Sequence, residues 1–348
     1  MVILIVSVIT ILILVILSSV FKIYTLIDII VGNYKKLANS SNKINGVLLF
    51  AFMIFGFISL SFYSYVEFDT YNIAVASEHG VFTDRLFVIN ILVTAGVFVA
   101  TQFALFYFPY RYNWTASRKP SFFVEDHKLE FIWTVVPAIA LTVLVFEGLK
   151  LWSNITETPP ENSEVIEIVG QQFGWKARYP GNSKRLGKYD YRLIDPTNEL
   201  GLDLTDHSSF DDFLSNTLYL PKGKPVLLKI RSKDVLHSCY IPHFRVKMDA
   251  VPGMPTRFWF VPQKTTLEMR DELNNSDFDY ELACAEICGK GHFTMRMLVK
   301  VENQSDYEKW FSSQNSWLSK NPEYLDQVPD NLKELALVKT GLENELYN

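Results

Sequence analysis

The stretch ELACAEICGKGHFTM, from Glu281 to Met295, gathers four potential ligands for a soft metal ion. Cys284, Cys288, His292 and Met295 follow one another with the spacing C-x3-C-x3-H-x2-M, so two thiols, an imidazole and a thioether lie within twelve residues. Thiolate and thioether sulfur favour copper over hard cations, and imidazole suits copper equally well. Calcium and magnesium are therefore poor candidates for these side chains, and the spacing predicts a copper site.

A second imidazole is available from His237, in the segment DVLHSCYIPHFRVKMDAVPG. Two alternatives to copper stay open on spacing alone. In an oxidising compartment Cys284 and Cys288 could form a disulfide, although this would leave His237, His292 and Met295 unexplained. Zinc could take both sulfurs and both imidazoles, and Met295 would then be an ordinary core methionine.

The chemistry of paired thiolates favours copper further. In blue-copper sites one Cys, two His and a weak Met hold a single ion on a rigid β scaffold. A second cysteine four residues away lets two thiolates bridge two copper ions, each completed by one His and one weaker ligand. Such a centre shares one electron between two metals, so we expect it to pass electrons and not to bind oxygen.

The first half of the chain is apolar enough to cross a membrane several times. The fourth apolar stretch is short, but Trp133 and Trp152 are typical interfacial anchors and Lys150 can extend to the interface, so we extend it to Trp152. Since about 20 residues cross a bilayer, four transmembrane helices are expected. The first stretch lacks a basic flank and is too long for a signal peptide, so a retained span is expected. The four stretches are Val2–Phe21, Val47–Val66, Leu86–Tyr110 and Phe131–Phe146.

Loop charges predict the orientation of these spans. Residues 32–46 carry three lysines and no acid, and the loop between the third and fourth spans carries four basic residues. The loop between the second and third spans carries four acids and one arginine. Because positive loops stay cytoplasmic, both chain ends and everything after Trp152 are expected to face outward.

The outer part of the chain is acidic and β-rich. Residues 151–348 hold 23 basic and 29 acidic side chains, which suits either a basic partner or simple solvation and gives no basic face for nucleic acid. Short runs separated by Pro and Gly turns predict a β-sandwich or barrel. Residues 181–212 are polar and are predicted to form an insertion. Residues 304–348 are predicted to form a charged helical tail. The predicted strands are Glu164–Gly170, Phe173–Tyr179, Thr217–Leu220, Val226–Arg231, Thr256–Val261, Asp279–Ala283 and Met295–Glu302.

From Leu86 to Glu302 the chain resembles subunit II of haem-copper cytochrome c oxidases, which carries the dinuclear copper A centre. The resemblance implies membrane helical hairpins followed by an all-β, cupredoxin-like Greek-key barrel. It also implies that the side chain of Glu286 binds magnesium or manganese at the boundary with subunit I. The family's D-V-x-H-S and C-x-E-x-C-x3-H-x2-M motifs imply the copper ligands His237, Cys284, Glu286 through its backbone carbonyl, Cys288, His292 and Met295.

Two further motifs carry the same resemblance. In HKLEFIWTVVPAIAL, Glu130 matches a residue that the family places at the mouth of a proton path into subunit I. GQQFGWKARYP departs from the family's G-H-Q-W-Y-W, because Phe173 stands where relatives have the Trp that receives the electron. Phe173 and Trp175 are therefore candidates for electron input, with an ordinary core position as the alternative for Trp175. Cys239 replaces an aromatic residue of the family and is expected to be a small buried hydrophobe.

The resemblance implies a respiratory function. The dinuclear copper centre is expected to accept electrons from a c-type cytochrome and to pass them to haem in subunit I, where oxygen reduction is coupled to proton pumping. A membrane-tethered copper chaperone is the rival hypothesis, since such proteins also use C-x3-C with a distant His. They need a thioredoxin-like βαβ pattern and no H-x2-M, and both requirements disfavour that rival here.

The family usually has two spans, so the first two spans here are extra and are expected to contact other oxidase subunits or a larger respiratory supercomplex. No C-x-x-C-H motif occurs, so haem is expected only in partner subunits. The expected location is a bacterial-type inner membrane, with the copper domain on the periplasmic side. The expected segments are 1–66 (extra helix pair), 67–152 (transmembrane hairpin), 153–303 (copper domain) and 304–348 (tail).

Overall fold

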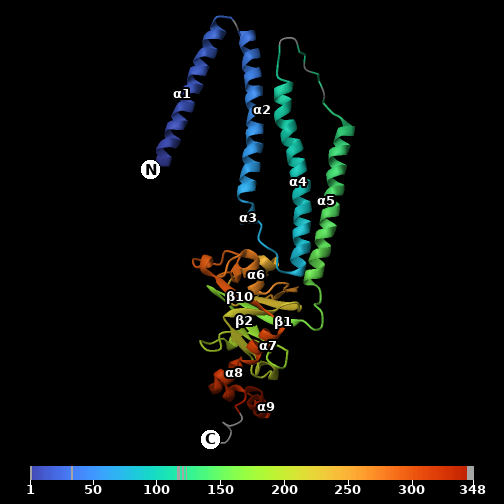
Figure 1. The fold of residues 1–348 in the computed structure, drawn as a ribbon, viewed down its shortest axis with the longest axis vertical. Helices are drawn as coiled ribbons and strands as arrows, with labels where there is room; N and C mark the ends of the chain where they lie inside the picture. Colours follow the sequence, from blue (N-terminus) through green and yellow to red (C-terminus); the bar gives the residue numbers. More distant parts are fainter. Residues whose placement is uncertain (1, 33, 116–117, 120, 123, 343–348) are drawn as a thin grey trace. The chain divides into compact units, whose positions relative to one another are not determined.

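The computed structural model describes residues 2–32, 34–115, 118–119, 121–122 and 124–342, and it divides the chain into two compact units (Figure 1). One unit comprises Met1–Asn72 and Ile89–Ile139, and the other comprises Ile73–Val88 and Ala140–Asn348. The second unit thus contains the outer domain together with the ends of two helices. Residues 343–348, the end of the predicted tail, lie outside the described residues.

Four helices in the described part of the chain are long and apolar enough to span a membrane, which confirms the prediction of four spans. Each helix is longer than the apolar run that predicted it, because polar residues at its ends continue the helical hydrogen bonding. Most of their large apolar side chains are exposed, as expected for surfaces that face lipid. The helices are α1 (Val2–Ile30), α2 (Tyr34–Val66), α4 (Glu78–Arg111) and α5 (His127–Thr156), with a short α3 (Phe68–Tyr71) after α2.

The outer domain is a sandwich of two five-stranded sheets, with strand orders β3-β2-β1-β5-β8 and β4-β10-β9-β6-β7. All seven predicted runs form strands, and three further strands, β3, β6 and β7, were not predicted. The strands are β1 (Glu164–Gln171), β2 (Gly174–Tyr179), β3 (Phe213–Ser215), β4 (Thr217–Pro221), β5 (Val226–Ser232), β6 (His237–Ile241), β7 (Val246–Ala250), β8 (Thr256–Phe260), β9 (Tyr280–Cys284) and β10 (Arg296–Glu302).

Alternation along the strands builds the core between the two sheets. Ile166 and Ile168 of β1 are fully buried, as are Leu228 and Ile230 beside them on β5. Val299 of β10 belongs to the same core cluster from the opposite sheet. Residues at alternate positions of a strand point to the same face, so the remaining side chains of β1 and β5 face outward.

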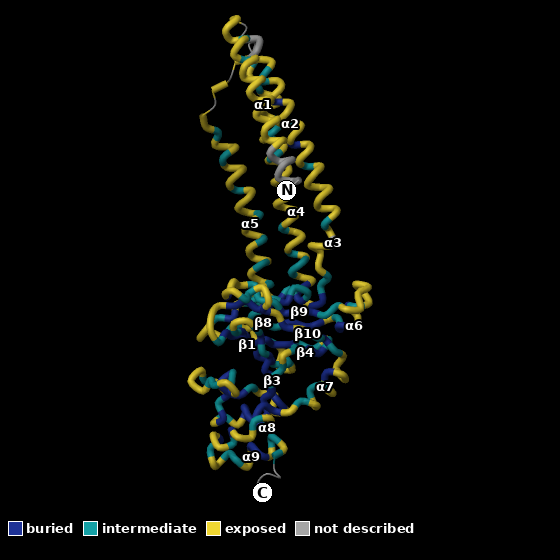
Figure 2. The backbone as a smooth tube through the Cα atoms, turned by 90° about the vertical axis from the view of Figure 1, so that its left-hand side faces the viewer, coloured by how far each residue is buried: buried dark blue, intermediate teal, exposed yellow. Residues whose placement is uncertain are grey.

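The insertion and the tail pack against each other around a second, smaller core, visible as the buried segments near α8 in Figure 2. Phe210 of the insertion and Leu318 of the tail are both fully buried there. The backbone N–H of Trp317 donates to the carbonyl of Asp212 at 2.7 Å. The tail helices are α7 (Gln304–Ser312), α8 (Trp317–Lys320), a 3-10 helix (Pro322–Gln327) and α9 (Asp330–Thr340).

Short helical segments complete the outer domain. Trp310 and Phe311 of α7 pack on the main core, so the first part of the tail covers the sandwich itself. The helix α6 (Thr266–Leu273) connects β8 to β9. The remaining turns are 3-10 helices at Tyr191–Leu193, His207–Ser209, Pro242–Phe244 and His292–Thr294.

Candidate metal centre

The metal-ligand motif occupies the loop between β9 and β10. β9 ends at Cys284, β10 begins directly after Met295, and the two strands pair antiparallel. The backbone N–H of Cys284 donates to the carbonyl of Met295 at 3.0 Å, so the two ends of the loop are held side by side. On the other edge of β9, Cys239 of β6 lies opposite Cys284, which brings His237 to the same end of the sheet.

The ligand atoms of the predicted side chains lie close together, each less than 4 Å from the ligand atom of at least one other. The sulfur atoms of Cys284 and Cys288 are 3.9 Å apart. Nδ1 of His237 lies 3.9 Å from the sulfur of Cys284, and Nδ1 of His292 lies 3.6 Å from that of Cys288. The thioether sulfur of Met295 is 3.7 Å from the sulfur of Cys288. Because metal bonds to sulfur and imidazole are about 2.0–2.3 Å long, two ligands of one ion lie roughly 3–4 Å apart, and these separations fit shared ions.

The backbone of Glu286 contributes to the same cluster. Its carbonyl oxygen lies 3.1 Å from the sulfur of Cys284, whereas the Glu286 residue itself is exposed. The arrangement is compatible with the predicted division of roles, in which the carbonyl faces copper and the carboxylate faces outward. All three cysteines are free, so Cys284 and Cys288 are available as thiolates.

Asp234 orients the first imidazole, and sequence reasoning did not single it out. His237 is completely buried, and its Nε2 lies 2.8 Å from a carboxylate oxygen of Asp234. A carboxylate that accepts the Nε2 proton leaves the lone pair of Nδ1 directed at Cys284, which is the usual arrangement of a metal-binding histidine. Although burial acts to raise it, the pKa of Asp234 is lowered by hydrogen bonds from the Gln172 backbone and from His237. The spacing D-x-x-H, from Asp234 to His237, was the sequence signal that could have indicated this role.

Burial and the neighbouring Cys284 sulfur raise the pKa of the Cys288 thiol to about 11. A low-dielectric environment and a second sulfur both disfavour a thiolate. A bound cation reverses this preference, because metal binding displaces the thiol protons. The pocket therefore favours a metal whose affinity for sulfur is high enough to compensate for deprotonation.

The hairpin turn between β1 and β2, residues 171–175, supports the ligand loop from outside. The side-chain amide of Gln172 donates to the carbonyl of Cys288 at 2.5 Å. The Phe173 ring lies so close to the loop that a Cβ on Gly291 would stand 2.6 Å from ring atoms, and one on Gly289 would stand 3.1 Å away. Gly289 also has a φ of +133°, which favours glycine. Two of the loop's glycines thus permit contact with Phe173.

Trp175 lies behind the centre and Phe173 at its surface. The Trp175 ring is buried, with its centroid 5.8 Å from that of His237 in an edge-to-face arrangement. A Cβ at Gly170 would be 2.9 Å from the Trp175 ring and 3.0 Å from the His237 ring, so that glycine allows the two rings to meet. Phe173 is 41% exposed.

The remaining predicted residues lie elsewhere. Glu130 is in the first turn of α5, where its carboxylate lies 3.3 Å from Nδ1 of His127. Thr156 ends the same helix, so Glu130 is at the opposite end of α5 from Thr156. Cys239 is fully buried behind the centre, and burial, followed by the nearby Cys284, raises its pKa well above the usual value. Cys239 therefore behaves as the small buried hydrophobe that the sequence predicted.

Fold and site together define a membrane protein whose outer β-sandwich carries, at one end of a sheet, a His/Cys/Cys cluster compatible with copper binding. Residues 164–302 match the family profile described as cytochrome c oxidase subunit II, periplasmic domain, and residues 63–151 match the corresponding transmembrane domain. The alternative cytochrome c oxidase subunit 2 of Bradyrhizobium diazoefficiens is 36% identical over 245 residues, which cover 70% of this chain and 83% of the relative.

Two other comparisons found similar proteins. Cytochrome c oxidase subunit 2 of Cereibacter sphaeroides is 29% identical over 232 residues, which cover 63% of this chain and 72% of the relative. The crystal structure of the periplasmic domain of subunit II of cytochrome oxidase from Bradyrhizobium japonicum aligns with a TM-score of 0.31 and 24% identity, covering 44% of this chain and 94% of that chain.

The chain belongs to the cytochrome c oxidase subunit II family, which confirms the resemblance drawn from its motifs. It is therefore a component of a haem-copper oxidase, with membrane-spanning helices and a periplasmic β-sandwich domain. The transmembrane match begins at residue 63, near the end of α2, so it includes α4 and α5 but not α1.

Proposed function

We propose that this chain is the electron-accepting subunit of its oxidase and that its outer domain holds a dinuclear copper centre. The observation that carries the proposal is a cluster in which ligand atoms of His237, Cys284 and Cys288 all lie within 4.8 Å of one another. His292 and Met295 extend this cluster on the side of Cys288. Two thiols with one imidazole each suit two copper ions, whereas one tetrahedral zinc would leave Met295 without a role.

When bound, the copper pair would supply one-electron redox chemistry with the charge shared between two ions. The residues of this chain keep that site rigid. Asp234 fixes the ring of His237, and the paired ends of β9 and β10 fix the loop. Cys288 and Met295 are buried, so they exclude water from one side of the cluster. Rigid ligands change little on oxidation, which favours fast electron transfer.

The surface over the ligand loop suits a docked electron donor. Ile287 is 83% exposed and Phe293 is 87% exposed, and both flank the ligand residues of the loop. Apolar groups with this exposure favour contact with another protein. We assign electron input to this surface, with a c-type cytochrome as the donor and Phe173 or Trp175 as the aromatic group nearest the transfer path.

The remaining roles follow from the family and are proposed here for the assembled complex. Electrons leave for haem in subunit I, where oxygen reduction is coupled to proton pumping. The exposed carboxylate of Glu286 contributes to a magnesium or manganese site at that boundary. The helices α1 and α2 contact additional oxidase subunits or a respiratory supercomplex. The assembly lies in a bacterial-type inner membrane.

A membrane-tethered copper chaperone remains the second candidate for the same ligands. A chaperone releases its ion, and a thioredoxin-like example needs helices between parallel strands. In the part of the outer domain that the structure describes, ten strands form two packed sheets and a helix separates β8 from β9, which are in different sheets. This architecture favours a resident centre over a carrier.

Metal analysis of the purified full-length chain tests the proposal. We expect two copper ions per chain and a mixed-valence electron paramagnetic resonance signal. Cys288→Ser should abolish that signal, whereas Cys239→Ala, which removes the buried thiol outside the cluster, should retain two coppers. One zinc per chain, or no metal with Cys284 bonded to Cys288, would overturn the assignment.

Glu130 provides a separate test of the proton role. In the assembled oxidase, Glu130→Gln should slow steady-state turnover severalfold, because an amide cannot take up and release a proton at the start of α5. Copper content should stay normal, since the outer domain is untouched. Glu125→Gln, which neutralises an exposed acid just before α5, is the matched control. Equal turnover of Glu130→Gln and wild type would contradict the proton role.

A further inference from the structure

One row of charged residues crosses the outer face of the sheet that contains β1. The strand register places Arg178 of β2 opposite Glu167 of β1, Glu167 beside Lys229 of β5, and Lys229 opposite Arg257 of β8. Residues in one register row share a face of the sheet, so these four side chains project to the same side. Three of the four are cationic, although residues 151–348 carry a net negative charge.

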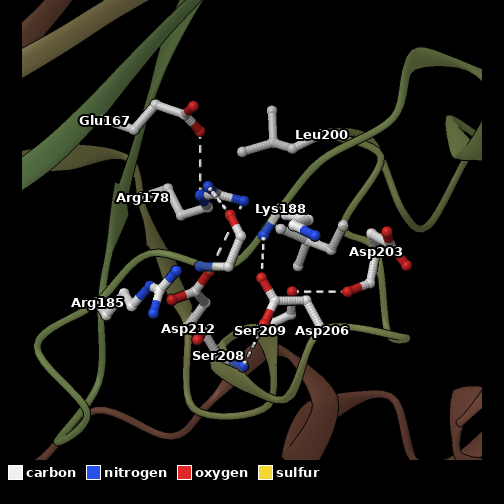
Figure 3. Close-up of polar contacts among 12 residues, drawn as sticks. Glu167, Arg178, Arg185, Lys188, Leu200, Asp203, Asp206, Ser208, Ser209 and Asp212 are labelled. Carbon is white, nitrogen blue, oxygen red and sulfur yellow. Dashed lines mark hydrogen bonds and ion pairs between the residues drawn. The ribbon is translucent and has the colours of Figure 1, made fainter.

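The acidic member of the row is fully engaged by two buried arginines. Glu167 accepts from Nε of Arg231 at 3.0 Å. Its carboxylate also lies 3.0 Å from Nε of Arg178, as Figure 3 shows. Arg178 also donates to the carbonyl of Gly187 at 2.7 Å and lies 3.6 Å from the carboxylate of Asp212. Both guanidinium groups and both carboxylates are almost completely buried. Burial raises the pKa of Asp212 to about 7, so near neutral pH the two arginines face one full carboxylate charge and part of a second. The cluster forms a fixed base beneath the insertion.

The insertion forms the other wall of an open cleft of about 880 Å³ over this base. Lys188 and Tyr189 of the insertion face Lys229, Arg231 and Arg257 of the sheet across it. The guanidinium carbon of Arg231 lies 3.9 Å from the centre of the Tyr189 ring, which holds the arginine in place. The cleft is separate from the metal cluster in sequence and in its lining residues.

The cations at the mouth of the cleft lack acidic partners. Among the residues that the structure describes, no carboxylate forms an ion pair with the side chain of Lys188, Lys229 or Arg257. The Asp206 carboxylate accepts from the backbone N–H of Lys188 at 3.1 Å, and Arg257 donates to the carbonyl of Thr156 at 3.0 Å. Besides Glu167, the lining contains two acids, and both are used locally. Asp190 accepts from the backbone N–H of Arg192, and Asp203 accepts from Thr205.

We propose that this cleft binds a phosphate-type anion. Lys229 and Arg257 are directly opposite in an antiparallel pair, so both can reach one tetrahedral anion, with Lys188 closing from the insertion. Arginine offers a planar pair of donors to phosphate oxygens, and lysine adds a point charge. The contacts of the Glu167 cluster beneath hold Arg178 and Arg231 in place, so Lys188, Lys229 and Arg257 determine the specificity. The phosphate belongs either to a soluble anion or to a lipid headgroup.

Titration of the full-length, copper-loaded chain with inorganic phosphate tests the proposal. Isothermal titration calorimetry should show saturable, one-to-one binding. Lys229→Gln combined with Arg257→Gln should weaken it by roughly tenfold or more, because charge-assisted hydrogen bonds are lost. Both residues are exposed, so the double variant should fold normally and retain its copper signal.

The matched control is Lys309→Gln with Lys320→Gln, which removes two exposed positive charges from the tail helices. It should bind phosphate as tightly as wild type. Equal weakening in both double variants would show a general charge effect and overturn the site. Absence of saturable binding by wild type in detergent would overturn it as well.

Nanodiscs distinguish the two sources of phosphate. The chain is reconstituted in phosphatidylcholine alone or in phosphatidylcholine with phosphatidylglycerol, and phosphate is titrated into each. Weaker phosphate binding in the phosphatidylglycerol discs at high ionic strength, where the repulsion between the anionic lipid surface and phosphate is screened, identifies a lipid headgroup as the occupant. Equal binding in both discs identifies a soluble phosphate. Either result supports the anion site.

Discussion

At the scale of single residues, Gly291 shows why the ligand loop contains glycines. Its φ is −94°, a value that any residue can adopt, so the backbone does not require glycine there. The requirement is space, because a Cβ would stand 2.6 Å from the Phe173 ring. The aromatic residue and the metal loop are thus fitted to each other across the surface of the centre.

Gly291→Ala should therefore destabilise the outer domain by about 1–3 kcal/mol, as overpacking generally does, and should shift the optical spectrum of bound copper. Thermal unfolding and absorption of the full-length chain measure both effects. Phe173→Ala removes the obstacle, so the double variant should recover most of the stability lost by Gly291→Ala. If the double variant did not recover stability, glycine would be required at position 291 by the backbone conformation and not by the close approach of the Phe173 ring.

Asp234→Asn tests the orientation of His237. Loss of a carboxylate behind a metal-binding histidine typically costs about 10–100-fold in metal affinity, and we expect a loss of that size for copper. Competition with a copper chelator measures it. Asp277→Asn, at an exposed acid remote from the centre, should leave the affinity unchanged. Unaltered affinity in Asp234→Asn would contradict the role.

The sequence was most informative at this scale where the ligands are close together in the chain. Soft donors at fixed spacing predict a shared ion because a short loop cannot place them far apart. Gln172 was missed because its role depends on a contact with Cys288, which is distant in sequence. Asp234 lies only three residues before His237, but an acid in a loop does not by itself indicate that it will orient an imidazole. The roles of Glu130, Phe173 and Trp175 stay predictions.

At the scale of elements, two of the three unpredicted strands, β3 and β6, gave weak local signals. β3 has three residues, too few for a periodic pattern. β6, with the sequence HSCYI, begins with two polar residues and shows no regular alternation, and it is held by pairing with β7 and β9 on both sides. The helix α6 did have a local signal, since Thr265 and Glu268 form a capping box.

The packing of the tail on the insertion has no signal in the sequence, because it joins residues about 100 positions apart. Leu318→Ala should loosen the second core, because removing a buried leucine side chain costs about 2–5 kcal/mol. Hydrogen exchange should then accelerate in residues 198–212 while the main sandwich stays protected. Leu335→Ala, at a leucine that is 40% exposed on α9, is the matched control. Unchanged exchange after Leu318→Ala would argue against mutual support.

At the scale of the whole molecule, four apolar helices and a two-sheet outer domain were predictable from hydropathy and strand periodicity. These patterns are averages over many residues, so small local errors do not alter them. The sheet order was not predictable from periodicity, since it depends on pairings such as the parallel contact of β1 with β5.

The stability of the molecule should depend on pH through His243. Burial, followed by the charge of Arg245, lowers the pKa of His243 to about 4, and its ring packs against Phe278 and Tyr280. Because the unfolded chain binds this proton near pH 6.5, the contribution to stability is complete above that pH and is lost as pH falls toward about 4. The loss should amount to about 1–3 kcal/mol.

Thermal unfolding of the full-length chain at pH 7.5 and pH 5.0 checks this expectation. His243→Gln cannot take up the proton, so its midpoint should fall less between the two pH values than that of wild type. His207→Gln, at an exposed histidine, should behave like wild type. An identical pH response of His243→Gln and wild type would assign the acid sensitivity to other groups.

The shared core of insertion and tail has a consequence for biosynthesis. Phe210 leaves the ribosome roughly 110 residues before Leu318, which at about 5–20 residues per second is a delay of several seconds or more. Throughout that interval the apolar side of the insertion has no cover. Chains that terminate before the tail would retain every proposed copper ligand yet expose this apolar surface. Such exposure would make them substrates for quality-control proteases before they can be assembled.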